Sequence, residues 1–389
     1  MKPILKFLSS LELTILCLSL SIVLIFFGTL DQANLGIHGA TEKYFYSVFV
    51  YRYIDSLGIS VPYMPGGYLI GFAFLINIVT VTFTRFTFNR RKLGIWMIHL
   101  GVILLLIGEF ISSVFQEEAS MTIDEGETAR YTESFRYSEL ALIDTTDPEK
   151  DRVYAIPEEM MKREQQINVE ELPFYVSIEE FLPNSALQRR GSFPTNSMKL
   201  ANKGIGLSHV AIEIPKTGKT DERNIPSALV TLFAKATEQR ESEVIGTWLA
   251  REFMPPQSFS YEGRDYMMQV RRKREYVPYE ITLLDFSHDR YLGTNIPKNF
   301  SSDVLLKDNR TGQEQEFLIY MNNPLRYDDL TFYQQGFMND DTTSILQVVR
   351  NPGRSLPYIS CTVITLGLMY QFGYSLIRYS DRRKKKAAA

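Results

Sequence analysis

Cysteine is nearly absent from this sequence. The chain has two cysteines among 389 residues, Cys17 and Cys361, and both fall in hydrophobic runs. Two cysteines this far apart exclude a disulfide framework, a C-x-x-C redox pair and zinc-type ligand spacing. The long polar segment between them, residues 116–354, has no cysteine. We therefore expect that segment to be held together by its hydrophobic core alone.

The motifs of self-sufficient enzymes are missing as well. The sequence has no glycine-rich phosphate loop, no nucleophile elbow and no H-E-x-x-H segment. Charge of one sign is not in large excess either, since the formal net charge is −3. Basic residues instead form short clusters beside hydrophobic runs, which indicates membrane topology and contact with anionic lipids, not nucleic acid binding.

Long hydrophobic runs are present, and they lie at the two ends of the chain. The mean hydropathy of −0.11 hides them, because the polar middle dilutes the ends. A bilayer core needs about 20 apolar residues. The first run is too long for the apolar region of a cleavable signal peptide and has no A-x-A-like end. The sequence therefore predicts four transmembrane helices, at about residues 7–30, 68–83, 93–115 and 356–377.

Basic residues flanking these runs predict the orientation of the chain. The positive-inside rule assigns the flanks richest in Lys and Arg to the cytoplasm. They precede the first run, separate the second from the third, and follow the fourth: Lys2, Lys6, Arg85, Arg90, Arg91, Lys92, Arg378 and the RRKKK tail. Both termini are thus expected in the cytoplasm. No transit segment is evident, so a bacterial plasma membrane is the expected location.

The polar middle is predicted to be β-rich. Its short β-branched and aromatic runs are separated by Pro, Gly and Asn clusters too short for crossover helices. We expect an antiparallel sandwich or open barrel, in one or two lobes, with one exposed helical patch at residues 157–172. The expected domains are residues 1–115 with three helices, 116–354 outside the membrane, and 355–389 with the last helix and a basic tail.

An aromatic cluster lies in the loop after the first run, at residues 31–67. Six aromatic residues are closely spaced there: Tyr44, Phe45, Tyr46, Phe49, Tyr51 and Tyr53. Amphipathic aromatic side chains settle at the headgroup level of a membrane. The stretch is predicted to be either an interfacial helix or a helix packed under the outer domain.

His99 is the most informative single residue, because it sits inside the third hydrophobic run. An ionisable group in hydrocarbon is costly and therefore indicates function. Gly94, Gly101 and Gly108 recur every seven residues and form a ridge that permits close approach of another helix. On a helical wheel His99 projects from nearly the opposite side. If the ridge packs on this chain's own helices, His99 faces a cofactor, a cavity or another subunit.

Two interpretations of His99 remain open from the residues alone. It could ligate a metal such as haem iron, with Lys92, about 10 Å nearer the cytoplasm on almost the same face, beside a propionate. It could instead make an interhelical hydrogen bond to a Ser, Thr or Asn side chain, for which Asn77 is a candidate partner. Lys92 could equally be a positive-inside anchor.

The remaining isolated ionisable residues carry weaker hypotheses. Glu109, near the outer end of the third run, is expected to snorkel or pair, and secondarily to take part in proton or haem chemistry. His38 in the outer loop is expected at the surface, with a second ligation site as the alternative. His209 and His288 are interpreted as ordinary surface or core residues.

Several separate blocks resemble one protein family, the ResB or CcsB proteins of cytochrome c maturation. The layout of three helices, a large outer domain and a final helix is similar over nearly the whole chain. The local matches occur in the family's order: SLELTILCLSL with GTLDQ, GIWMIHLGVILLLIG, LLDFSHDRYLGTNIPKNFSSDV, NNPLRYDDLTFYQQGF and NPGRSLPYIS.

The resemblance implies a haem-handling subunit of a membrane cytochrome c synthase, or haem lyase, non-catalytic or co-catalytic in itself. Its implied partners are a ResC- or CcsA-type membrane protein and apocytochrome c. That partner carries a tryptophan-rich haem-handling segment, whereas this chain has two tryptophans in all. His99 matches the family's third-helix histidine, so the resemblance implies that it ligates haem b shared with the partner.

A rival hypothesis comes from a different class. The chain could be a structural or assembly subunit whose outer β domain docks another complex, with His99 only hydrogen-bonded. A transporter permease is a weaker third hypothesis, because no pair of Gly- or Pro-interrupted helices indicates a repeat-based substrate site.

Overall fold

The structure of the chain is a computed structural model. It describes residues 3–54, 58–85, 89–192, 198–217, 223–236, 242–294, 297–338 and 341–387. The chain forms two compact units. The helical unit comprises the two ends of the chain, up to Glu117 and from Arg350 onward. The β-rich unit comprises Glu118–Thr217 and Arg223–Val349.

Among the described residues, four helices are long and apolar enough to cross a membrane. They are α2 (Leu11–Ala40), α3 (Gly67–Arg85), α4 (Leu93–Phe115) and α6 (Leu356–Ala387). The predicted architecture, with three apolar helices before a β-rich region and one after it, is confirmed. Shorter elements of the same unit are α1 (Pro3–Leu8), the π-helical turn η1 (Thr41–Phe45) and the 3₁₀ turn η2 (Arg90–Lys92).

Side-chain caps explain where two of the helical segments begin. The Ser10 hydroxyl accepts a hydrogen bond from the Leu13 N–H at 3.1 Å, which caps α2. The Asn89 side chain accepts from the Lys92 N–H at 3.1 Å and caps η2, directly before α4. Each cap occupies one of the N–H groups that a helix start leaves without an intrahelical acceptor.

The aromatic stretch after the first helix differs from both predicted arrangements. α2 runs on to Ala40, with a kink at Gly36, whose φ is 72°. Beyond the π-helical turn the chain forms an antiparallel hairpin of β1 (Phe49–Ile54) and β2 (Ile59–Pro65). The prediction of a helix is therefore wrong for this part. Alternating β-branched and aromatic residues favour strands, and the prolines of β2 disfavour a helix interior.

The β-rich unit is built on three sheets. The largest has the order β15-β14-β13-β4-β3-β18-β17-β16, with β12 added to β13 and β5 to β4. Its strands are β3 (Glu117–Asp124), β4 (Thr128–Asp144), β5 (Arg152–Pro157), β12 (Gln257–Tyr261), β13 (Arg264–Arg290), β14 (Pro297–Asp308), β15 (Glu314–Tyr320), β16 (Leu325–Tyr327), β17 (Leu330–Met338) and β18 (Thr343–Arg350).

Two smaller sheets complete this unit. The four-stranded sheet has the order β11-β10-β7-β6 and the two-stranded sheet pairs β8 with β9. Their strands are β6 (Gln166–Asn168), β7 (Phe174–Leu182), β8 (Ser185–Arg189), β9 (His209–Glu213), β10 (Ser227–Ala234) and β11 (Val244–Arg251). The short helices α5 (Glu158–Met161) and η3 (Gly204–Leu207) lie between strands.

Two hydrophobic cores lie along the longest strands. β4 and β13 pair antiparallel, and each contributes to both cores. The first core includes Phe174, Trp248 and Tyr266, and the second includes Tyr279 and Phe332. Since the described part of this unit contains no cysteine, these cores are the main source of its stability, as expected from the sequence.

The predicted exposed helical patch at residues 157–172 is shorter and more buried than expected. It contains only α5, followed by strand β6, which pairs with the edge of β7. Met161, Ile167 and Leu172 pack in the first core. The high charge of the segment favoured exposure, but these three apolar side chains decide its position because their burial is worth about 1.5–3 kcal/mol each.

Candidate functional site around His99

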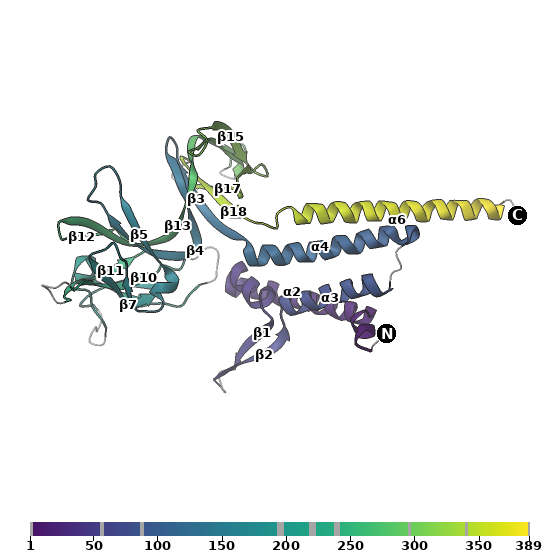
Figure 1. The fold of residues 1–389 in the computed structure, drawn as a ribbon, viewed down its shortest axis with the longest axis horizontal. Helices are drawn as coiled ribbons and strands as arrows, with labels where there is room; N and C mark the ends of the chain where they lie inside the picture. The colour runs from purple at the N-terminus through teal and green to yellow at the C-terminus, as the bar shows by residue number, and fades with distance from the viewer. Residues whose placement is uncertain are drawn as a thin grey trace. The chain divides into compact units, whose positions relative to one another are not determined.

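The glycine ridge of α4 packs against α6 in the same chain. Helices α4 and α6 lie side by side (Figure 1). A Cβ placed at Gly94 would lie 2.6 Å from the Gly367 carbonyl oxygen, and one at Gly108 would lie 2.8 Å from Cβ of Leu356. Only glycine permits so close an approach of the two backbones. The α4 face opposite the ridge therefore turns away from α6.

His99 lies on that other face, where its partner is α3. Its Nδ1 is 2.9 Å from Oγ1 of Thr82, a residue that is 2% exposed. The Thr82 hydroxyl is also 2.6 Å from the Ile78 carbonyl oxygen, which can only accept a hydrogen bond. The hydroxyl proton goes to Ile78, so Oγ1 accepts the proton of His99 Nδ1–H. This chain of bonds selects the tautomer whose lone pair is on Nε2.

Asn77, the candidate hydrogen-bond partner, bonds to other residues and not to His99. Its Oδ1 accepts from the Thr14 hydroxyl at 2.6 Å, and its Nδ2 donates to the Leu8 and Ser10 carbonyl oxygens at 2.8 and 3.0 Å. It ties α3 to the junction of α1 and α2. Asn77 and Thr82 are five positions apart, about 140° around the helix, so they face different neighbours.

Lys92 occupies the turn before α4 and not the helix itself. It is the last residue of η2, with φ −111° and ψ 5°. The wheel that placed it on the His99 face assumes helical backbone through residue 92, and that backbone begins at Leu93. Its side chain is half-buried.

The other single ionisable residues lie in separate surroundings. Glu109 is exposed on α4. His38 belongs to the last turns of α2 and not to a loop, and its Nε2 is 3.2 Å from the Glu42 carboxylate. His209 begins β9 and contacts the Ser208 hydroxyl at 2.8 Å. Across the described residues, no three His, Cys, Asp or Glu side chains gather as a metal site.

His288 is buried beside Phe300 and Phe337, which pack against the second core. Its side chain is 3% exposed, its Nδ1 is 2.8 Å from the Asp341 carboxylate, and its ring lies 4.3 Å from that of Phe337. Arg290 pairs with the same carboxylate. Asp341 lies in the turn before β18, with a positive φ of 71°. Because His288 and Arg290 at the end of β13 both contact its carboxylate, they hold this turn against β13. The structure gives His288 a core position.

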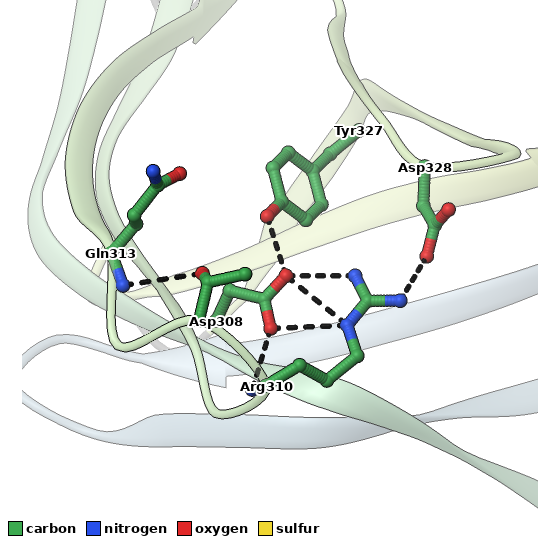
Figure 2. Close-up of polar contacts among 6 residues, drawn as sticks. Asp308, Arg310, Gln313, Tyr327 and Asp328 are labelled. Atoms are coloured by element: carbon green, nitrogen blue, oxygen red, sulfur yellow. Dashed lines mark hydrogen bonds and ion pairs between the residues drawn. The ribbon is translucent and has the colours of Figure 1, made fainter.

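A charged cluster that sequence reasoning missed closes the turn between β14 and β15 (Figure 2). The Asp308 carboxylate, 1% exposed, accepts from Arg310 Nη2 and from the Tyr327 hydroxyl, each at 2.7 Å. Arg310 also reaches Asp328 at 2.9 Å. Arg310 and then Tyr327 hold the pKa of Asp308 well below its ordinary value. Because the charges and hydrogen-bonding atoms of these four residues are paired with one another, we interpret the cluster as structural. We call Asp308, Arg310, Tyr327 and Asp328 the clasp.

The clasp makes the β-rich unit sensitive to acid. A lowered folded-state pKa stabilises the fold fully above the ordinary value of 3.8, and that stabilisation is lost as the pH falls below it. We expect Asp308→Asn to lower the unfolding temperature at pH 7, and the difference from wild type to shrink below about pH 4. Near-ultraviolet circular dichroism melts measure this. A difference that stays constant with pH would contradict the interpretation, and Asp151→Asn, at an exposed position, is the control for loss of a carboxylate.

Comparison with known proteins finds a similarity in the second half of the β-rich unit. A sequence model of the ResB-like family matches residues 257–345, from β12 into β18. Protein NrfI of Wolinella succinogenes is 31% identical over 94 residues, which are 24% of this chain and 10% of that protein. The chain thus aligns with only a small part of its relative. Residues 257–345 are therefore similar to the ResB-like family, and the described part of the chain also has the four apolar helices and the β-rich unit expected from the sequence.

Proposed function

We propose that this protein acts in cytochrome c biogenesis as a haem-handling membrane subunit, with His99 as an axial ligand. The match of residues 257–345 to the ResB-like family model supports the process. His99 lies outside the matched segment, so the ligand role rests on geometry. The observation that carries it is the bond from His99 Nδ1 to Thr82, whose hydroxyl is itself bound to Ile78.

One residue, His99, fits the requirements of an axial haem ligand. Haem iron takes neutral imidazole as an axial ligand, and a second hydrogen bond at the far ring nitrogen orients such a ligand. His99 has both properties, because Thr82 holds Nδ1–H and the lone pair is on Nε2. Lys92 is retained as a candidate for a propionate, on the cytoplasmic side of His99. When bound, haem would be cargo for attachment to apocytochrome c.

A partner is part of the proposal. In this proposal His99 supplies one axial ligand, held by its hydrogen bond to Thr82. The second ligand would come from a ResC- or CcsA-type membrane protein. Apocytochrome c would meet the β-rich unit on the outer side of a bacterial plasma membrane, with both termini in the cytoplasm. The chain would then be a non-catalytic or co-catalytic part of a haem lyase.

The first test is the haem content of the purified complex. The chain would be co-expressed with its cognate membrane partner, and pyridine haemochrome spectra would be recorded. We expect b-type haem in a fixed ratio to the complex. A complex that is intact but free of haem would contradict the proposal and favour an assembly role.

Thr82→Val tests the orienting bond separately from the ligand. Valine keeps the shape of threonine but removes the acceptor for His99 Nδ1–H. Loss of such an outer hydrogen bond costs about 10–100-fold in metal affinity, and we expect about tenfold weaker haem retention. Thr84→Val is the matched control, because the Thr84 hydroxyl makes the same kind of bond, 2.6 Å to the Thr80 carbonyl oxygen, on an exposed position of α3. Equal haem retention in the two variants would contradict the orienting role.

A further inference from the structure

The hairpin of β1 and β2 is an isolated two-stranded sheet in the helical unit. It projects to the side of α2 and α3 at the ends where those helices are joined (Figure 1). A lone two-stranded hairpin is marginally stable at best in water. Something beyond its own hydrogen bonds must therefore hold it and cover it.

The base of the hairpin is fixed to the helices by apolar contacts. Val50 is fully buried in a small core with Tyr44, Leu24 and Ile70, which come from η1, α2 and α3. This core anchors one face of β1. The hairpin is thus an ordered extension of the helical unit.

A polar network reinforces this attachment. Asp31 Oδ2 accepts from Lys43 Nζ at 2.6 Å and from the Tyr44 hydroxyl at 2.8 Å. The Tyr44 hydroxyl is in turn 3.1 Å from that of Tyr63 on β2. The network links α2, η1 and the second strand, so both strands are tied to the helices.

The backbone connection to α3 is equally short. The Gly66 N–H donates to the Val48 carbonyl oxygen at 2.9 Å, and the Tyr68 N–H donates to that of Ser47 at 3.2 Å. A Cβ at Gly67 would lie 2.8 Å from Cα of Phe45. The two strand ends are therefore held against the start of α3, and the hairpin cannot move far from the point where the chain enters that helix.

Beyond its base the hairpin exposes large apolar side chains. Five of them are 43–59% exposed: Phe49, Tyr51, Tyr53, Ile59 and Tyr63. Phe49, Tyr51 and Tyr53 alternate along β1 and share the face opposite Val50. Across the described strands Phe49–Ile54 and Ile59–Pro65, Arg52 is the single charged residue. Such a surface is poorly matched to bulk water.

The position of this surface indicates what covers it. Both helices that flank the hairpin are apolar enough to cross a membrane, so their junction lies where the hydrocarbon ends. Tyrosine is enriched at that depth, because its ring is apolar and its hydroxyl is polar. The adjoining helices also expose large apolar side chains, such as Ile37 on α2 and Phe72 on α3.

We propose that the β1–β2 hairpin lies in the headgroup layer of the bilayer, with the face of Tyr51 and Tyr53 in contact with lipid. Arg52, on the other face of β1, reaches lipid phosphates or water. The hairpin anchors the helix ends at a set depth. This inference needs only the membrane crossing of α2 and α3 and is independent of haem binding.

Site-directed spin labelling tests this position, since the chain has only two cysteines to replace. The full chain carrying Cys17→Ala and Cys361→Ser would receive Tyr51→Cys or Tyr53→Cys. Leu318→Cys is the control, because Leu318 is similarly exposed, at 54%, in the β-rich unit. Each protein would be labelled with a nitroxide in nanodiscs of phosphatidylethanolamine and phosphatidylglycerol, and collision with oxygen and with a water-soluble nickel chelate would be measured.

At residues 51 and 53 we expect collision with oxygen to exceed collision with nickel, and the reverse at residue 318. Collision with nickel at residues 51 and 53 equal to that at residue 318 would place the hairpin in water and overturn the proposal. Low collision rates with both reagents would show that protein covers the hairpin, which overturns it as well. If one of the two hairpin variants misfolds, the other still tests the proposal.

Discussion

His99→Ala is expected to lower haem retention by the complex of this protein with its membrane partner by more than about 100-fold. Loss of an outer hydrogen bond alone costs about 10–100-fold, and removal of the ligating ring should cost more. Cytochrome c yield should fall in parallel, because the complex would hold less haem for attachment to apocytochrome c. Pyridine haemochrome measurement and haem staining of mature cytochrome c report the two effects.

A matched histidine variant distinguishes ligand loss from a general effect. His38→Ala removes a half-exposed imidazole near the end of α2, paired with Glu42 at 3.2 Å, and should leave haem content and cytochrome yield at wild-type levels. Thermal melts of both variants check that the fold is retained. If His99→Ala kept wild-type haem and cytochrome yields, ligation by His99 would be ruled out.

Gly101→Leu is expected to separate α4 from α6. The new Cβ would lie 3.0 Å from the Ser360 carbonyl oxygen and 3.2 Å from the Ile364 backbone nitrogen. Insertion of side-chain atoms into a packed interface costs about 1–3 kcal/mol, and more where backbone blocks the space. We expect a lower yield of folded protein and a lower unfolding temperature in detergent, measured by fluorescence-detected size exclusion.

Gly373→Leu provides the control for that result. Gly373 also lies on α6, but a Cβ placed there meets no atom within 4 Å. The same increase in hydrophobicity should therefore be tolerated. Equal loss of folded protein in both variants would show that the ridge does not hold the two helices together.

The helices and the direction of the His99 face could be predicted from the sequence because each depends on local periodicity. Apolar runs of sufficient length define the helices, and a glycine every seventh residue defines a ridge. The face opposite that ridge follows from helical geometry alone. The predicted direction of His99 required that the glycine ridge pack on this chain's own helices. The structure shows that it packs on α6.

The identity of the residue bonded to His99 could not be predicted in this way. Asn77 and Thr82 are both polar residues on α3, and the rotation of α3 about its own axis decides which one faces α4. That rotation depends on distant contacts, such as the hydrogen bonds from Asn77 to Leu8 and Ser10. A Ser, Thr or Asn side chain was expected as the partner, and Asn77 was named as the candidate in place of Thr82.

The hairpin was missed for a related reason. Its aromatic residues indicated a membrane interface, but a strand of six or seven residues carries little periodic signal against a helix of similar length. The clasp around Asp308 depends on Tyr327 and Asp328, about 20 residues along the chain. Such pairs follow from sheet register, which the sequence alone does not specify.

Addition of imidazole to the His99→Ala complex tests the central claim most directly. If His99 acts as an axial ligand through Nε2, free imidazole should fill the vacated position, restore the low-spin haem spectrum and recover part of the cytochrome c yield. The same imidazole should change little in the wild-type complex. A His99→Ala complex that stays free of haem at saturating imidazole, while retaining the fold and the partner, would contradict the account.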